Sequence, residues 1–157
     1  MEPRTLFAIV WCFGLLVLAV IDAETGFLPD ALTLPLALIG GAAAVAGYGP
    51  GITEALLGGV LGGGSFFLLA QGYRKLRGEE GLGGGDVKLM AAAGIWCGPW
   101  VLPFLVLFAS LTGLLFAGGA YLMGHHQGGL QQEIRFGPFL AGAAAAVYLT
   151  PLPFAPF

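Results

Sequence analysis

The stretch from residue 6 to residue 21 reads LFAIVWCFGLLVLAVI, and Asp22 follows it directly. A helix needs about 20 mostly apolar residues to cross the hydrocarbon core of a bilayer. This run, extended by a few residues at either end, therefore predicts a membrane-spanning helix with a carboxylate at its end. No convincing small-x-small cleavage site closes the run and more apolar segments follow, so we expect a retained first span rather than a secretory signal.

Further apolar segments follow along the chain. They are Ala31–Gly47, Ile52–Tyr73, Val87–Cys97, Trp100–Met123 and the segment from Phe136 onward, centred on Leu140–Leu149. Together the segments predict an all-α polytopic membrane protein of about six transmembrane helices, in a single membrane-embedded domain over residues 1–157. The fourth segment, of about 11 residues, is short for a crossing. We expect its helix to begin before Asp86 or to run past Pro99, with a re-entrant segment as the alternative.

The composition also indicates a membrane environment. Of the 157 residues, 57% are hydrophobic and 10% are charged, and the mean hydropathy is +0.88. A soluble domain carries about 25% charged residues. The formal net charge of −3 gives no sign of nucleic-acid binding. Cys12 and Cys97 lie in apolar runs without a C-x-x-C pair, so we expect two small buried hydrophobic residues and no zinc site.

Glycines in the third segment follow a helical spacing. Gly58 and Gly62 lie one turn apart, as do Gly59 and Gly63, and small residues at this spacing let membrane helices approach closely. We expect internal helix packing here, with a contact between two copies of the chain as the alternative.

The basic residues predict the orientation. With six crossings both termini lie on one side, and the links after the first, third and fifth segments lie on the other. Those links hold all the basic residues but Arg4, namely Arg74, Lys75, Arg77, Lys88 and Arg135. Under the positive-inside rule these links are expected to be cytoplasmic.

Carboxylates fall at three of the expected membrane boundaries. Asp22 ends the first segment, Asp30 precedes the second, and Asp86 follows three glycines at the start of the fourth. Ionisable groups within spanning segments are costly and by default mark function, although a carboxylate solvated at a helix end is the simpler interpretation of Asp22 and of Asp86. Asp30 is expected to cap its helix, where a carboxylate accepts backbone N–H bonds.

Two carboxylates in a site of low dielectric do not both ionise easily and hold one proton between them. One then activates water while the other protonates the carbonyl oxygen or the leaving amine, the chemistry of aspartic proteases. Gly83 and Gly85 would let a substrate backbone come close, with a flexible interhelical loop as the alternative. Lys88 would stabilise charge near Asp86 or extend its ammonium to the membrane interface.

Four sequence features carry a family resemblance, in order, over nearly the whole chain. They are Asp22, LPDALTLP at residues 28–35, GGGDVKL at 83–89 and FGPFLA at 136–141. These features resemble the prepilin peptidases of type IV pili and type II secretion, which belong to the GxGD intramembrane aspartyl proteases. The resemblance implies catalytic roles for Asp22 and Asp86. Candidates for substrate binding or support are Asp30, Gly83, Gly85 and Lys88.

The resemblance also implies a substrate and a place of action. The expected activity is that of an endopeptidase in the inner (cytoplasmic) membrane, with its active site facing the cytoplasm and with no cofactor. Its expected partners are the lipid bilayer and prepilins or pseudopilin-like proteins, from which it would remove a short basic leader. Many bacterial members carry an N-terminal region with two C-x-x-C pairs, associated with N-methylation. This sequence has no such cysteines, so we expect a peptidase-only form or an isolated catalytic domain.

Other polar residues are weaker candidates. His125, His126 and Glu133 have no convincing metal-ligand spacing, so no metal is expected. Glu79 and Glu80 are expected to face water, or to meet a basic leader. Two rival functions stay open: a small transporter or channel component that binds protons or cations through the carboxylates, and a non-catalytic assembly protein packed by its glycines.

Overall fold

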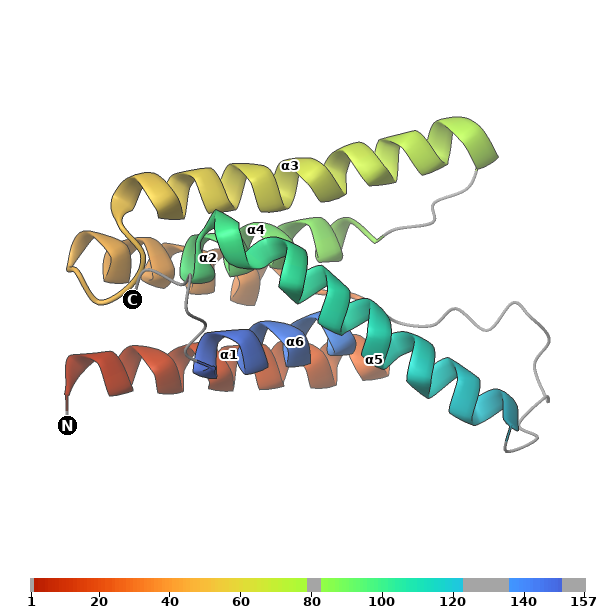
Figure 1. The fold of residues 1–157 in the computed structure, drawn as a ribbon, viewed down its shortest axis with the longest axis horizontal. Coiled ribbons are helices and arrows are strands. Elements are labelled where there is room, and N and C mark those ends of the chain that lie inside the picture. Colours follow the sequence, from red (N-terminus) through yellow and green to blue (C-terminus); the bar gives the residue numbers. More distant parts are fainter. Residues whose placement is uncertain (1, 79–82, 123–135, 151–157) are drawn as a thin grey trace.

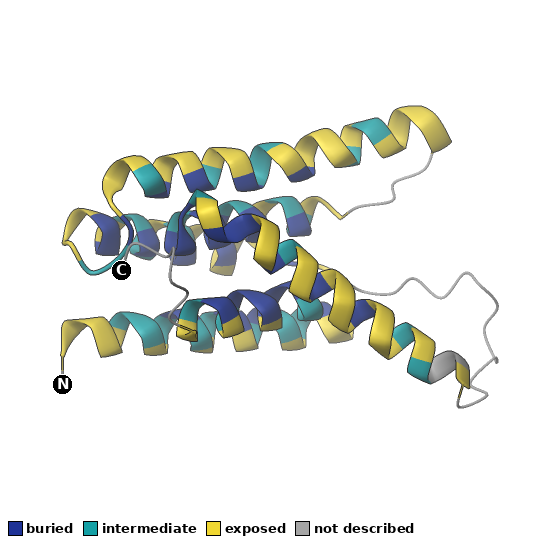
Figure 2. Ribbon diagram, in the orientation of Figure 1, coloured by how far each residue is buried: buried dark blue, intermediate teal, exposed yellow. Residues whose placement is uncertain are grey.

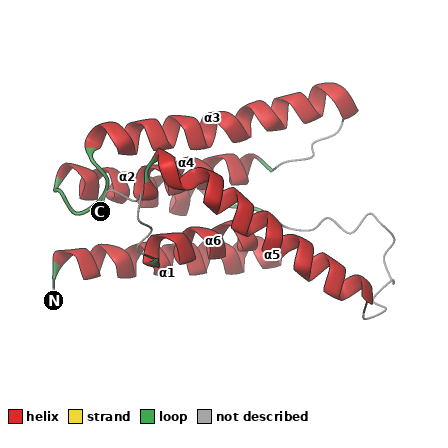
Figure 3. Ribbon diagram, in the orientation of Figure 1, coloured by secondary structure: helices red, strands yellow, loops and turns green. Residues whose placement is uncertain are grey.

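The computed structural model describes residues 2–78, 83–122 and 136–150. Within these ranges every regular element is helical, and no strand occurs (Figure 3). The elements are α1 (Pro3–Thr25), α2 (Asp30–Val45), α3 (Ile52–Arg77), α4 (Gly84–Cys97), the short 3₁₀ turn η1 (Pro99–Val101), α5 (Leu102–Leu122) and α6 (Gly137–Leu149). The predicted all-α fold is confirmed, and each expected segment corresponds to one helix.

Successive helices run in alternating directions, and α5 crosses the others obliquely (Figure 1). The last turns of α1 and α3 therefore lie at the same end of the bundle as the first turns of α2, α4 and α6. This end carries Asp22, Asp30 and Asp86, and we call it the aspartate end. The alternation explains how Asp86 reaches the same end of the molecule as Asp22 and Asp30, although it lies 56 residues after Asp30 in the sequence.

The outer surface of the bundle is suited to lipid. Three stretches in the described part of the chain are long and apolar enough to cross a membrane: Pro3–Thr25, Ile52–Arg77 and Pro99–Gly119. The helices α2 and α6 are shorter but also apolar. Large apolar side chains such as Leu38 and Leu68 point outward and are exposed, and exposed residues cover the outer faces of the helices (Figure 2). The chain is a polytopic all-α membrane protein.

The short helix α4 forms the centre of the bundle. It packs against α2, α3 and α6, and its buried residues include Leu89, Met90 and Trp96. It begins at Gly84, which confirms the expectation that the fourth helix starts before Asp86. It does not run past Pro99, because Gly98 has a positive φ of 76° and Pro99 opens a separate turn.

The glycines of α3 bring this helix into backbone contact with α4. A Cβ on Gly58 would come 2.7 Å from the carbonyl carbon of Gly94, and one on Gly62 would lie 3.2 Å from the carbonyl carbon of Met90. Any side chain at these positions would force the two helices apart. The predicted role of these glycines in internal packing is confirmed.

Aromatic rings join four helices inside the bundle. Trp11 of α1 stacks on Trp96 of α4 with ring centroids 4.9 Å apart, and Tyr148 of α6 meets Trp96 edge-on at 5.9 Å. The indole N–H of Trp96 donates to the backbone carbonyl of Leu36 in α2 at 2.8 Å. Nearby Cys97 is buried and Cys12 is partly buried, both as free thiols, as expected for small apolar residues.

Candidate active site

Asp22 is held inside the last turn of α1 rather than at its end. The helix continues to Thr25 and stops at Gly26, whose N–H donates to the carbonyl of Asp22 at 2.8 Å and whose φ of 68° suits glycine. Asp22 is only 5% exposed. The simpler interpretation, a carboxylate solvated at a helix end, therefore does not hold for Asp22.

Asp86 lies in the first turn of α4 and is also buried, at 8% exposure. Its backbone N–H donates to the carbonyl of Gly83 at 3.1 Å. The carboxyl groups of Asp86 and Asp22 are close enough to interact electrostatically. The structure thus brings together the two carboxylates that the sequence analysis paired, one from α1 and one from α4.

A third helix reaches this pair through Gly137, the first residue of α6. A Cβ at Gly137 would come 2.6 Å from Cγ of Asp22, so only glycine fits against the carboxyl group. Gly137 is buried, and Pro138 follows it in the first turn of the helix. Gly137 and Pro138 belong to the FGPFLA motif at residues 136–141, but the sequence alone predicts no role for Gly137, because a glycine at a helix start is the only local signal.

Asp30 does not act as the predicted helix cap. The residue before the helix is Pro29, and in the described residues no side chain makes a capping bond at the start of α2. Instead, Oδ1 of Asp30 accepts a hydrogen bond from Nζ of Lys88 at 2.5 Å. The capping expectation was wrong because a cation from α4 lies within reach of this carboxylate.

Lys88 serves a different partner from the one expected. It lies two residues after Asp86, about 200° around the helix axis, and its side chain is 46% exposed whereas Asp86 is buried. Its ammonium pairs with Asp30, whose side chain is 52% exposed. The expectation that Lys88 stabilises charge near Asp86 is not what the contacts show.

The two glycines singled out before Asp86 have different surroundings. A Cβ at Gly85 would meet the side chain of Leu28 at 2.7 Å, so the first turn of α4 lies directly on the connection between α1 and α2. Gly83 is exposed, and a Cβ there would lie 3.9 Å from Oδ2 of Asp86. Gly85 is thus a packing contact, while Gly83 borders the carboxylate.

Several weaker candidates lie outside the described residues, namely Glu79, Glu80, His125, His126 and Glu133. In the part of the chain that the structure describes, no three His, Cys, Asp or Glu side chains gather in a way that would hold a metal ion.

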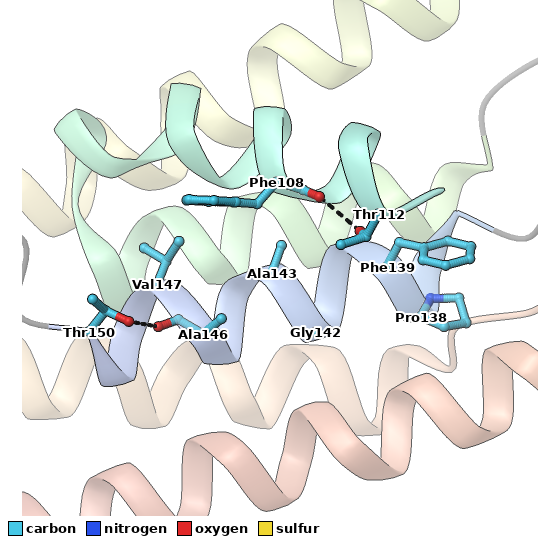
Figure 4. Close-up of a pocket in the computed structure, with 9 residues that line it drawn as sticks. All are labelled: Phe108, Thr112, Pro138, Phe139, Gly142, Ala143, Ala146, Val147 and Thr150. Carbon is cyan, nitrogen blue, oxygen red and sulfur yellow. Dashed lines mark hydrogen bonds between the residues drawn. The ribbon is translucent and has the colours of Figure 1, made fainter. Parts of the chain in front are cut away.

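An apolar groove of about 430 Å³ lies between α5 and α6 (Figure 4). Phe108 and Thr112 form its α5 wall, and residues from Pro138 to Thr150 form its α6 wall. The hydroxyl groups of Thr112 and Thr150 donate to backbone carbonyls of their own helices. The groove therefore offers an apolar surface rather than reactive groups.

Comparison with known proteins agrees with the motifs. The model of the type IV leader peptidase family matches residues 9–118, a range that includes Asp22 and Asp86. A prepilin leader peptidase/N-methyltransferase of Dickeya chrysanthemi is 45% identical over 137 residues, which cover 85% of this chain and 47% of the relative. The protein of the same description from Dichelobacter nodosus is 36% identical, over 94% of this chain and 50% of the relative.

A third relative, from Burkholderia pseudomallei, has the same description and is 38% identical over 91% of this chain and 46% of its own length. This chain thus spans about half the length of the curated relatives it matches. No solved structure matches it significantly. The matched family range and the extent of these identities establish that the chain belongs to the type IV leader peptidase family.

Proposed function

We propose that this chain is an aspartic endopeptidase that removes the leader peptide from prepilin-like proteins, with Asp22 and Asp86 as the catalytic pair. The single observation that carries the proposal is the meeting of two buried carboxylates, from α1 and α4, at one end of a membrane bundle. The description of the relatives as prepilin leader peptidases supports the choice of substrate.

The chemistry follows from one proton shared by two carboxylates. The ionised carboxylate takes a proton from a water molecule, and the water oxygen attacks the scissile carbonyl carbon. The protonated carboxyl gives its proton to the carbonyl oxygen, which forms a tetrahedral diol. The carbon–nitrogen bond then breaks as the amine takes up the proton that the first carboxylate received. A diol proton returns to the other carboxylate and restores the pair.

Burial favours this scheme over simple solvation of the two groups. In water each carboxyl would ionise at neutral pH, and neither would hold the proton that the carbonyl oxygen needs. At the aspartate end both residues are more than nine-tenths buried, and two negative charges that interact in such surroundings repel strongly. A singly protonated pair, the state from which hydrolysis begins in this scheme, avoids this repulsion.

We propose further that the aspartate end faces the cytoplasm. In the described residues the bases Arg74, Lys75, Arg77 and Lys88 all belong to the last turn of α3 or the first turns of α4, at this end. Arg4 lies in the first turn of α1, at the opposite end. This asymmetry supports a cytoplasmic active site under the positive-inside rule.

The test is cleavage of a prepilin-like peptide that carries a basic leader and an apolar helix. The variants Asp22→Asn and Asp86→Asn, each purified in detergent micelles, are expected to lose at least about a thousandfold in kcat, because neither can complete the proton relay. Glu24→Gln is the matched control, since Glu24 is an exposed carboxylate two residues beyond Asp22. It is expected to cleave at close to the normal rate.

Substantial cleavage by either Asn variant, with the helical content unchanged, would remove the carboxylate pair from the mechanism. A transporter that binds cations through the carboxylates predicts a different result, in which the parent chain leaves the peptide intact. If the chain is an assembly protein without catalysis, the parent chain also leaves the peptide intact. Both Asn variants would then keep the assembly function of the parent.

A further inference from the structure

We infer that Asp30 and Lys88 are positioning residues, whose ion pair fixes the first turn of α4 and thereby the place of Asp86 relative to Asp22. The inference rests on the proposed function and deepens it, since it assigns a task in the same site to two residues whose bond in the described part of the chain is to each other. Four observations carry it.

The first observation is how little side-chain material anchors the start of α4. Gly83, Gly84 and Gly85 precede Asp86 and have no side chains to pack. Glycine also leaves the backbone freer than any other residue does. On the N-terminal side of Asp86, the contacts of the neighbouring residues must therefore help to set its position.

The second observation is the close contact between Gly85 and Leu28. Leu28 is 3% exposed, and its side chain lies where a Cβ of Gly85 would be. The connection from α1 to α2 therefore forms the surface on which the first turn of α4 rests. This connection begins four residues after Asp22, at Gly26, so it is tied to the position of the other catalytic carboxylate.

The third observation is the ion pair itself. Nζ of Lys88 donates to Oδ1 of Asp30 and links the first turn of α4 to the first turn of α2, 58 residues apart in sequence. It lies on the exposed side of the turn, whereas Leu28 contacts Gly85 on the buried side. Together the two contacts hold the turn from two directions.

The fourth observation is the direction of the two side chains on α4. Asp86 is buried, and Lys88 extends outward to Asp30. Lys88 is therefore placed to orient the turn without touching the carboxylate pair. Because ion pairs between half-exposed groups contribute little to global stability, variants of this pair are expected to fold, and their effect is expected in catalysis.

The experiment is a charge reversal in the full chain, with kcat and KM measured on the prepilin-like peptide. Asp30→Lys and Lys88→Asp each place like charges opposite one another, which pushes the turn away from α2. Each is expected to lower kcat about tenfold to a hundredfold, the cost of a small misplacement of a catalytic group, with KM nearly unchanged. The double variant Asp30→Lys with Lys88→Asp is expected to recover most of the lost kcat.

Two controls match these changes in charge. Glu24→Lys and Lys75→Asp reverse exposed charges at the same end of the bundle, and both are expected to leave kcat unchanged.

A second pair of variants tests the buried side of the turn without a change in charge. Gly85→Ala is expected to lower kcat because it displaces Leu28, whereas Gly84→Ala, where an added Cβ meets no described residue within 4 Å, is expected to lower it less.

A double variant no more active than the weaker single reversal would overturn the inference. So would single reversals that raise KM and leave kcat alone, since Asp30 and Lys88 would then be substrate contacts. Amide hydrogen exchange over residues 83–90 separates this inference from the proposed function. Even in a chain that cleaves nothing, each single reversal is expected to speed exchange there and the double variant to slow it again, and unchanged exchange in all three would refute the inference.

Discussion

Gly137 lies directly against the carboxyl group of Asp22, where a Cβ would come 2.6 Å from Cγ. This contact joins the first turn of α6 to the last turn of α1. It limits where the carboxyl group of Asp22 can lie, because the α6 backbone occupies the space on that side. If Asp22 and Asp86 act as a pair, the α6 backbone therefore helps to set the separation of their carboxyl groups.

Gly137→Ala is therefore expected to impair catalysis more than folding. The added methyl group overlaps the Asp22 carboxyl and must rotate it or move α6, and a displacement of this kind costs about tenfold to a hundredfold in kcat. The measurement is the rate of peptide cleavage per folded molecule, with folding checked by thermal unfolding in detergent micelles.

Gly142→Ala is the matched control for Gly137→Ala. Gly142 lies in the same helix, and an added Cβ there would meet none of the described residues within 4 Å. It is expected to keep full activity and an equal or slightly higher Tm, since alanine favours a helix by up to about 1 kcal/mol over glycine. Equal activity of the two variants would show that Gly137 does not constrain Asp22.

The contact between α3 and α4 predicts an effect on stability. Gly58→Ala gains about 1 kcal/mol in helix propensity, but its methyl group would lie 2.7 Å from a backbone carbon of Gly94. Backbone does not move as a side-chain end does, so the overpacking cost, about 1–3 kcal/mol or more, is expected to prevail and lower the Tm.

Gly64→Ala serves as the comparison, since Gly64 lies in the same helix and an added Cβ would meet no described residue within 4 Å. Its Tm is expected to stay the same or rise. A Tm for Gly58→Ala equal to that of Gly64→Ala would contradict the close packing of α3 on α4.

Trp96→Phe is expected to lower stability and leave catalysis unchanged, whereas Gly137→Ala is expected to impair catalysis more than folding. It removes the hydrogen bond to the Leu36 carbonyl, worth about 0.5–1.5 kcal/mol, and leaves a cavity beside Trp11, so the Tm should fall. Trp96 lies ten residues from Asp86 along α4, which is about 15 Å of helix, so cleavage per folded molecule should stay normal. A loss of kcat at full stability would instead connect the aromatic cluster to the site.

Helix positions and the paired carboxylates could be predicted because their signals lie along the chain. Apolar length sets the helices, and Asp22 and Asp86 stand out since charge is rare in membrane segments. The packing of Gly58 and Gly62 was also predictable, because small residues one turn apart mark a close contact. For the helices and for these glycines the physical cause lies in the local sequence, whereas the shared role of Asp22 and Asp86 follows from the family resemblance.

Contacts between helices could not be predicted in the same way. In a membrane both the core and the lipid face of a helix are apolar, so no alternation of polarity tells which face meets which neighbour. The sequence around Asp30 and Lys88 fits an ion pair between them. It fits equally well a carboxylate that caps α2 and a lysine that extends to the membrane interface. The approach of Gly137 to Asp22 likewise depends on the register between α1 and α6, which a single glycine does not specify.

The orientation of the bundle gives the last prediction, and two glycines offer matched probes. Gly84 lies at the aspartate end and Gly51 at the opposite end, and an added Cβ at either would meet no described residue within 4 Å. Both are exposed, and neither has a positive φ. Cysteine can therefore replace each glycine without strain.

Because Cys97 is buried and Cys12 is partly buried, the parent chain is expected to react little with a membrane-impermeant maleimide. If the bases of α3 and α4 hold the aspartate end in the cytoplasm, Gly84→Cys is expected to be labelled only in inside-out vesicles and Gly51→Cys only in intact cells with a permeable outer envelope. The opposite pattern would place Asp22 and Asp86 outside the cytoplasm and exclude cleavage of a leader peptide on the cytoplasmic side.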